Sequence, residues 1–365
     1  MIKKNKIVAL WFVLSILLIP SCTITINQPL GISTTAFPQG NITLPPSATV
    51  LPIRWSHLRL AGKLIYPSTV YQSQSTSMGV RLLDLTTGIV TTIFQVPDGG
   101  WVDAIAVSPD DTQMILAYTP PIHADNGGIR ALYLLPLNGS GTPKLLFPPA
   151  SAYDQYFQPE WSLDGKYVYF THANGNQNPV TFDIWRMPYP NGMPSKLGDN
   201  TAWPRVSNDG KQLVYVWINP KTSVNRLVVA DVDGANDYKL TLKGLPIPVI
   251  DAPIFSPDNQ SIFFSSPNVG QSFRPGAIPI QFKSAKPYAD GTIPSDWWFV
   301  AVVGGKPQQL TNIRSLALYG NYSPDKKYIV FYSADGIFLM RPDGSDLIKM
   351  VDEVGQLGGT VSWIP

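Results

Sequence analysis

The sequence predicts an all-β protein, a six-bladed β-propeller built from four-stranded antiparallel blades. Its composition, with 11% aromatic residues, 35 prolines and 29 glycines, suits many short strands joined by turns. No amphipathic helical period is sustained between these turns. The main observation is a serine-led turn that recurs along the chain, with its serines at Ser108, Ser162, Ser207, Ser256, Ser323 and Ser362.

Residues 1–22 have the pattern of an export signal. Three lysines precede an apolar run over residues 7–19, which is too short to span a bilayer comfortably. The segment resembles a bacterial lipoprotein signal, because Ser21 precedes Cys22, the single cysteine of the chain. This resemblance implies that Cys22 is lipidated and anchors the protein to a bacterial membrane. An ordinary signal peptide or an uncleaved anchor is the alternative, and both readings place the remainder outside the cytoplasm.

Residues 23–57 are expected to form a flexible tether. They are rich in Thr, Ser, Asn and Pro and show neither a strand period nor a helix period. A lone cysteine in an exported chain allows no intrachain disulfide, so stability must come from apolar burial. The 44% apolar content can supply it.

Residues 58–365 repeat one order of segments and are expected to form one propeller domain. Each serine-led turn is followed by an aromatic-rich strand such as 166–170, a second strand such as 182–187, a glycine turn and a short last strand. Spacings of 39 to 67 residues between the turn serines fit four-stranded blades. The last copy has one strand, and the first segment lacks that strand. The C-terminal strand should therefore join three N-terminal strands and close the ring.

The turn residues are expected to serve structure, since Ser and Asp side chains hydrogen-bond turn backbones and Pro presets φ. The turn Phe255-Ser256-Pro257-Asp258 and the Gly-Gly-x-Pro-x-x-Leu-Thr segment over 304–311 resemble the TolB-type propeller repeat. The resemblance covers residues 58–365 and implies a six-bladed propeller. TolB itself is a soluble periplasmic protein with an additional N-terminal α/β domain. This chain has a lipoprotein signal and a short tether in that place, so the partners of TolB are not carried over.

No motif in the chain indicates catalysis. A Gly-x-Ser-x-Gly elbow, a P-loop and a dinucleotide fingerprint are all lacking, and His57, His123 and His172 lack metal-ligand spacing. We therefore expect no catalytic residue, no cofactor and no metal. Removing the three lysines of the signal changes the formal charge from +2 to −1 (+2 − 3 = −1), so no nucleic-acid partner is expected either.

The candidate binding residues precede the serine-led turns, on the strands that should line the central channel. We expect them at one channel mouth, as in a site for a small ligand or a peptide. A solvated channel without a ligand is the alternative. These candidates are Asp103, Glu160, Trp203, Arg205, Asp251 and Tyr319.

A second candidate is the excursion over residues 267–296, within the longest interval. It contains Phe273, Arg274, Phe282 and Tyr288, and aromatic and Arg side chains dominate many interfaces. The excursion either caps the channel mouth and contributes to a partner site, or folds over the blade edge as a structural loop. The sequence leaves both readings open.

The expected function is that of a non-catalytic cell-envelope lipoprotein whose monomeric propeller binds an envelope protein, a peptide or another ligand. The alternative is a hydrolase or lyase that acts on a glycan or peptide at the channel mouth, with Asp103, Glu160 and Asp251 as its acids. Converging carboxylates with raised pKa values would favour this enzyme. A structural ring within a larger envelope complex is a third possibility, which a large exposed apolar patch would indicate.

Overall fold

The computed structural model describes residues 48–71, 76–222, 224–243, 247, 249–267, 294–352 and 359–365. These residues belong to one compact unit, Leu44–Pro365. The predicted lipidation site Cys22 lies outside the described residues, as do the four candidates of the excursion, Phe273, Arg274, Phe282 and Tyr288.

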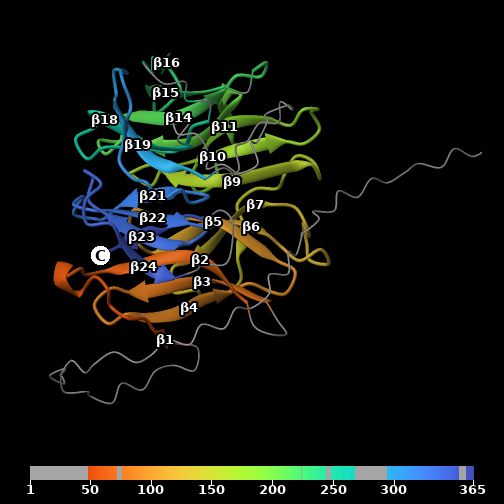
Figure 1. Cartoon of the computed structure of the whole chain (residues 1–365). Helices are drawn as coiled ribbons and strands as arrows, with labels where there is room; N and C mark the ends of the chain where they lie inside the picture. Colours follow the sequence, from red (N-terminus) through yellow and green to blue (C-terminus); the bar gives the residue numbers. More distant parts are fainter. Residues whose placement is uncertain are drawn as a thin grey trace, which may run out of the picture. The chain divides into compact units, whose positions relative to one another are not determined.

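The described residues form six antiparallel sheets, and each sheet is one blade (Figure 1). Blade 2 consists of β5 (Trp101–Val107), β6 (Gln113–Thr119), β7 (Ala131–Pro136) and β8 (Lys144–Leu145). Blade 3 consists of β9 (Asp154–Trp161), β10 (Tyr167–Asn174), β11 (Thr181–Pro188) and β12 (Ser195–Asp199). Blade 4 consists of β13 (Thr201–Val206), β14 (Gln212–Ile218), β15 (Asn225–Asp231) and β16 (Tyr238–Lys239). Blades 5 and 6 consist of β17 (Asp251–Phe255), β18 (Ser261–Ser266), β19 (Asp296–Ala301) and β20 (Gln308–Gln309); and β21 (Tyr319–Tyr322), β22 (Ile329–Ser333), β23 (Gly336–Met340) and β24 (Ile348–Asp352).

Blade 1 joins the two ends of the domain. Its strands are β25 (Ser362–Ile364), β2 (Lys63–Tyr71), β3 (Thr76–Asp84), β4 (Ile89–Gln95) and β1 (Thr49–Val50), hydrogen-bonded in that order. Leu64 pairs with Trp363 across the closure, and the C-terminus lies beside β2 in Figure 1. The first strands β5, β9, β13, β17, β21 and β25 contact one another in a closed cycle. The predicted six-bladed ring and its closure by the C-terminal strand are confirmed.

The propeller begins earlier than the predicted boundary at residue 58. Strand β1 pairs with β4, the indole of Trp55 is 1% exposed and donates to the Leu85 carbonyl at 2.7 Å, and Arg54 forms a 2.5 Å ion pair with Asp352. The short 3-10 helix η1 (Ser56–Leu58) follows. The end of the predicted tether therefore belongs to blade 1. A two-residue strand has no readable period, which is why the sequence pattern did not separate it from the tether.

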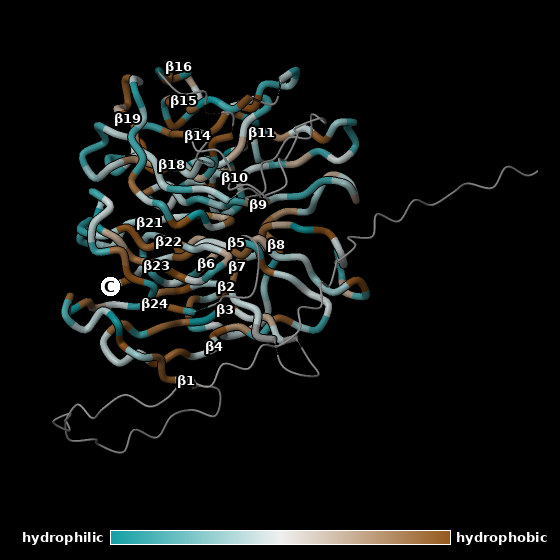
Figure 2. The backbone as a smooth tube through the Cα atoms, in the orientation of Figure 1, coloured by the Kyte–Doolittle hydropathy of each residue, from teal (hydrophilic) through white to brown (hydrophobic). Residues whose placement is uncertain are grey.

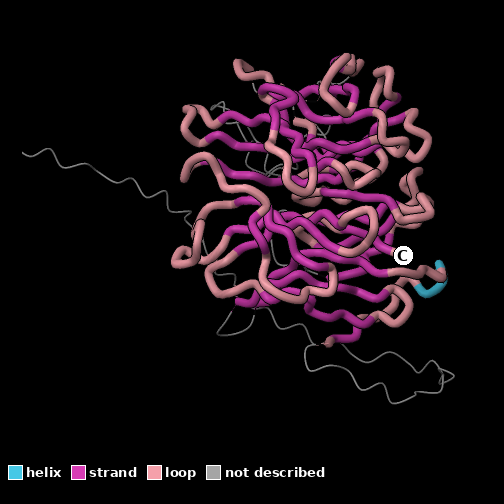
Figure 3. Tube along the Cα trace, turned by 180° about the vertical axis from the view of Figure 1, so that it is seen from behind, coloured by secondary structure: helices cyan, strands magenta, loops and turns pink. Residues whose placement is uncertain are grey.

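The core lies between the blades. Because each blade is covered on both faces by its neighbours, its middle strands are continuous apolar runs rather than alternating ones. Residues Met114–Tyr118 of β6 are all buried, for example. Hydrophobic colour follows the strands in Figure 2, and hydrophilic colour gathers on the connections. Apart from η1, the described secondary structure consists of strands and their connections (Figure 3).

The serine-led turns have one geometry in blades 2 to 6. Each serine hydroxyl donates to the aspartate two residues later, at 2.5–2.7 Å, and accepts from the backbone N–H five residues later, at 2.8–3.1 Å. The turns join the first and second strands of each blade, and we call the face that carries them the turn face. The opposite face carries the loops that lead into the first strands and is called the loop face. The predicted structural role of the turn residues is confirmed.

Candidate binding site in the central channel

Three neighbouring first strands share a local distortion of the backbone. In β9, β13 and β17 the pairing register shifts at a residue with positive φ that is followed by proline. These residues are Gln158 (φ 54°), Trp203 (φ 63°) and Ala252 (φ 48°), each four positions before its turn serine. A non-glycine residue in this region costs on the order of 1–3 kcal/mol and persists only where its surroundings hold it. Such bulges often re-aim side chains beside functional sites.

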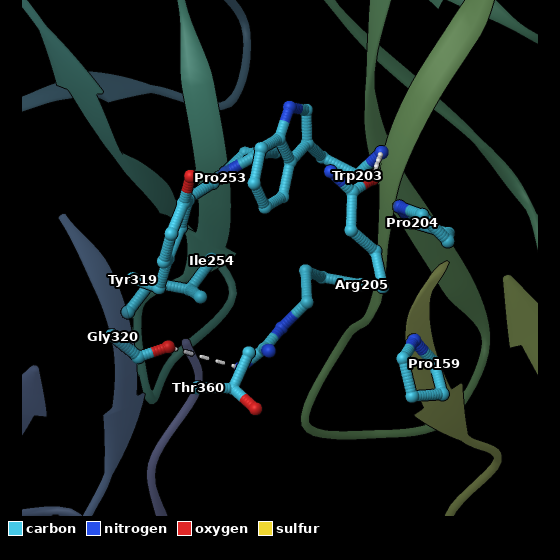
Figure 4. A pocket seen from close by; sticks show the side chains of 11 residues that line it. Pro159, Trp203, Pro204, Arg205, Pro253, Ile254, Tyr319, Gly320 and Thr360 are labelled. Atoms are coloured by element: carbon cyan, nitrogen blue, oxygen red, sulfur yellow. Dashed lines mark hydrogen bonds between the residues drawn. The ribbon is translucent and has the colours of Figure 1, made fainter. Parts of the chain in front are cut away.

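The bulges border a cavity in the central channel (Figure 4). Its lining comes from the first strands of blades 3 to 6 and the segment just before β25. The cavity is large enough to hold water. The residues that line it are Gln158, Pro159, Trp203, Pro204, Arg205, Ala252, Pro253, Ile254, Tyr319, Gly320 and Thr360.

Two aromatic rings line the cavity, at strand positions nearer the loop face than Arg205. Trp203 of blade 4 stacks on Tyr319 of blade 6, with ring centroids 4.7 Å apart and an interplanar angle of 26°. The backbone N–H of Trp203 donates to Gln158 Oε1 at 2.9 Å and to Thr171 Oγ1 at 3.2 Å, so the bulge of blade 3 fixes that of blade 4. The two residues are 8% and 7% exposed. Figure 4 shows the two rings on one side of the cavity and Arg205 on the other.

An arginine and a glutamate lie on the turn side of the cavity. The Arg205 guanidinium donates to the Gly320 carbonyl at 3.2 Å, and its Nη1 lies 3.6 Å from Glu160 Oε2. The other Glu160 oxygen accepts from the Val206 N–H at 3.4 Å. Burial raises the pKa of Glu160, while Arg205 and, more weakly, Lys326 oppose the rise. The ion pair of Arg205 and Glu160 is therefore longer than a hydrogen bond, and its two side chains are largely buried.

Two acids lie nearer the loop face. Asp103 is paired within blade 2, and Asp251 is buried in blade 5. Asp103 forms a 2.6 Å ion pair with Arg130 and accepts from the Trp101 indole at 2.9 Å. Burial raises the pKa of Asp103, against the effects of Arg130 and Trp101. Asp251, the first residue of β17, is 4% exposed. Two of the three acids considered for catalysis thus have arginine partners.

The six candidates all lie on first strands, but the structure spreads them along the channel. Asp103 and Asp251 precede their turn serines by five residues, whereas Glu160 and Arg205 precede theirs by two. At about 3.3 Å per residue, this difference corresponds to roughly 10 Å along a strand. Asp103 and Asp251 therefore lie nearer the loop face than Glu160 and Arg205, with Trp203 and Tyr319 between them, and a binding role for these residues stays a prediction.

Several residues of the site were missed by the sequence reasoning. Arg130 comes from the connection before β7, and Thr360 bridges to blade 2 by accepting from the Ile105 N–H at 2.7 Å. The recurrence of proline three residues before Ser162, Ser207 and Ser256 was the available signal for the bulges.

The three histidines do not line the cavity. His172 and Asp154 make a buried 2.9 Å pair at the loop-side ends of β10 and β9, while His57 and His123 are exposed. Among the described residues, no group of three or more His, Cys, Asp or Glu side chains is placed to hold a metal ion. Within the same residues, no helix is long and apolar enough to cross a membrane.

Comparisons with known proteins place the fold. No protein-family model and no curated protein sequence matches the chain. TolB from Acinetobacter baumannii superposes with a TM-score of 0.59 at 17% identity, over 82% of this chain and 66% of that one. A putative TolB from Agrobacterium tumefaciens superposes with a TM-score of 0.53 at 19% sequence identity, over 84% of this chain and 99% of that one. A chain in a structure of a nidogen/laminin complex superposes with a TM-score of 0.55 at 10% sequence identity, over 82% of this chain and 98% of that one. The chain thus spans just under two thirds of the Acinetobacter protein, and it has the six-bladed propeller fold of the TolB structures.

Proposed function

We propose that the protein is a non-catalytic binding module of the bacterial cell envelope, held at a membrane by a lipid on Cys22. The lipoprotein-like signal over residues 1–22 and the similarity to TolB propellers support this proposal. A rigid ring presents connecting loops whose sequences are free to vary, and this suits recognition better than chemistry. The partner is an envelope protein or peptide that binds the loop face.

The observation that carries the proposal is the presence of three exposed apolar side chains on neighbouring loops at the loop face of blades 2 and 3. Ile122, Tyr153 and Val180 are 75%, 66% and 41% exposed. Their loops are adjacent, because the Gly175 N–H donates to the Tyr153 carbonyl at 3.0 Å and the Tyr156 N–H donates to the Arg130 carbonyl at 3.0 Å. A contiguous exposed apolar area marks a protein interaction site, and the proposal takes these three neighbouring loops as one such surface. We call Ile122, Tyr153 and Val180 the loop-face patch.

The base of the loop-face patch is firm. The buried pair of His172 and Asp154 joins the two strand ends beneath the Tyr153 loop. Arg130 lies over the Phe157 ring at 5.6 Å while it pairs with Asp103. Side chains presented from an ordered base lose less entropy when they bind a partner.

The channel itself is poorly suited to catalysis. Trp203 and Tyr319 stack on each other across the channel, with ring centroids 4.7 Å apart, and both line the cavity. Asp103 and Glu160 come from different blades, and each faces an arginine. The hydrolase or lyase alternative requires two acids directed at one substrate, and no contact of these acids supports that arrangement.

Capture of the partner from membranes tests the proposal. The full-length lipidated protein is crosslinked mildly in its native envelope and purified, beside the double variant Ile122→Ser/Tyr153→Ser. The matched control is Met193→Ser/Val303→Ser, which alters two side chains on the turn face that are each 85% exposed. We expect a defined partner with the wild type and the control, and its loss from the loop-face variant. Equal recovery from both variants would contradict the proposal.

The anchor is tested separately. Metabolic labelling with palmitate should mark the wild-type protein and leave Cys22→Ala unlabelled. Unchanged labelling of the variant would refute lipidation at Cys22, without bearing on the loop-face patch.

A further inference from the structure

Exposed apolar side chains occupy the turn face in several blades. Val50, in the outermost strand β1 of blade 1, is 55% exposed. Met193 follows β11 of blade 3, Val303 follows β19 of blade 5, and each is 85% exposed. Leu163 of blade 3 and Leu347 of blade 6 are also exposed. The first three of these residues thus lie in blades 1, 3 and 5, which are every second blade of the ring.

Met193 and Val303 are presented from ordered, uncharged turns. Val303 lies in the connection over residues 301–305, where a backbone hydrogen bond of 2.8 Å closes the turn. Met193 lies in the connection over residues 188–195, which another backbone bond of 2.8 Å closes. Neither connection contains an acidic or basic residue. The exposure of the two side chains is therefore a property of the fold.

The carboxylates of the serine-led turns lie nearer the channel than Met193 and Val303 do. Those turns join the first and second strands of a blade, whereas Met193 and Val303 lie between third and fourth strands. Some of the turn carboxylates are also neutralised locally, as where Lys166 pairs with Asp164 at 3.2 Å. The outer turns of blades 3 and 5 can therefore approach a lipid surface without carrying a carboxylate into it.

The chain enters the domain on the turn face. Strand β1 pairs with Ile89 and Val90, which begin β4 directly after the turn-face connection from β3. Figure 3 shows η1, which follows β1, beside the C-terminus. Residues 23–47, between the proposed lipid on Cys22 and the described domain, number 25 (47 − 22 = 25) and reach at most about 90 Å. This length allows the domain to touch the membrane and leaves the choice of face to the surface of the domain.

We propose that the turn face rests on membrane lipid through Val50, Met193 and Val303, and that the loop-face patch points away from the membrane. This inference rests on the lipid anchor of the proposed function. Three contacts in alternate blades define one plane, so a flat bilayer meets all three, whereas a compact partner meets only part of them. Their side chains enter the boundary between headgroups and acyl chains. So few side chains bind weakly, and the anchor supplies the local concentration that makes the contact persist.

Fluorescence quenching by nitroxide-labelled lipids tests this orientation. The full-length lipidated protein is reconstituted in vesicles of phosphatidylethanolamine and phosphatidylglycerol, with a thiol-linked fluorophore on Met193→Cys, Val303→Cys or Tyr153→Cys. Nitroxides near the headgroups should quench the labels at 193 and 303 at least about twofold more than the label at 153. The wild type should take up no label, because lipidation consumes the Cys22 thiol. Labelling of the wild type would show that the anchor is absent, and the proposed orientation would fall with it.

Two double variants separate the turn face from the loop face. In protein labelled at Leu347→Cys, Met193→Ser/Val303→Ser should reduce the quenching about twofold or more, because two of the three contacts are lost. The lipid still holds this variant at the membrane, so its capture of a loop-face partner should persist. Ile122→Ser/Tyr153→Ser should leave the quenching unchanged, so failure of the loop-face proposal remains distinguishable. Equal quenching at 193 and 153, as expected if the turn face meets solvent or a protein, would overturn the proposal. Stronger quenching at 153, or no effect of Met193→Ser/Val303→Ser, would overturn it as well.

Discussion

The two ends of the first strands differ in how their polar groups are used. At the turn end, the same serine and aspartate recur in blades 2 to 6 with nearly identical hydrogen bonds. Farther along the strands, each blade presents different side chains, such as Asp103, Trp203 and Tyr319. A group that is required in every blade serves the fold. A group that occurs in one blade, and is held there in a strained backbone, is the better candidate for function.

The pKa values of the acids follow the same division. The serine hydroxyls and backbone N–H groups of the turns lower the pKa of Asp110, Asp164, Asp209 and Asp258. At Asp325 burial works against the shift, and the hydrogen bonds from Ser323 and Lys327 still lower the pKa. In the channel, burial raises the pKa of Asp103 and Glu160 instead.

The largest expected effect on stability is that of Trp203→Ala. The variant removes a buried ring stacked across the channel and leaves alanine in the same strained backbone, so we expect a loss of about 3–5 kcal/mol in the free energy of unfolding. Urea denaturation measures it. Met193→Ala on the turn face, 85% exposed, should stay within about 0.5 kcal/mol of the wild type. A loss below about 1 kcal/mol for Trp203→Ala would show that the ring is not a packed part of the channel.

Ser207→Ala should cost less, about 1–3 kcal/mol, because the part-buried Gln212 N–H loses its hydroxyl acceptor and Asp209 loses its donor. The same denaturation experiment checks this value. The exposed Ser140, outside the repeated turns, is the control, and its replacement by alanine should change stability little. Equal small effects at both serines would remove the structural role assigned to the repeat.

Alanine-to-glycine substitutions at equivalent positions of two blades should change the free energy of unfolding in opposite directions. Ala252 has φ 48°, so Ala252→Gly relieves strain and should stabilise the protein by up to about 1 kcal/mol. Ala104 lies at the same distance from its turn serine in blade 2 without a positive φ, and Ala104→Gly should destabilise by roughly 0.5–1 kcal/mol. Destabilisation by both substitutions would contradict the strained bulge of blade 5.

The pH dependence of stability should separate the turn acids from the channel acids. Asp164 has its pKa lowered to about 2, so its stabilising contribution is present above the unfolded value of about 3.9 and is lost as the pH falls through about 2. Glu160 has a raised pKa, so its contribution falls as the pH rises above about 4.3. Asp164→Asn should reduce the loss of stability at acidic pH. Glu160→Gln should reduce the change of stability with pH above about 4.3. If both substitutions changed the pH dependence of the free energy of unfolding in the same direction, the distinction between turn acids and channel acids would be refuted.

The repeat allowed the architecture to be predicted, because one recurring turn counts the blades and an incomplete first and last copy imply closure. The start of the domain was misplaced, since Trp55 and the two residues of β1 join blade 1 through contacts distant in sequence. The recurring proline marks the position of the bulge at Trp203, but the hydrogen bonds that hold it come from Gln158 and Thr171 of another blade and are not visible in the local sequence. Likewise, Arg130 reaches Asp103 from the connection between β6 and β7. Sequence spacing gives a position along a strand, but it does not give the partner across the channel.

Site-specific photocrosslinking from the two faces tests the central claim most directly. A benzophenone amino acid replaces Tyr153 on the loop face in one protein and Met193 on the turn face in another, both in the lipidated full chain. Crosslinking in native envelopes should yield one defined partner adduct from position 153 and none from position 193. An adduct from position 193 alone, or equal adducts from both positions, would contradict recognition at the loop face.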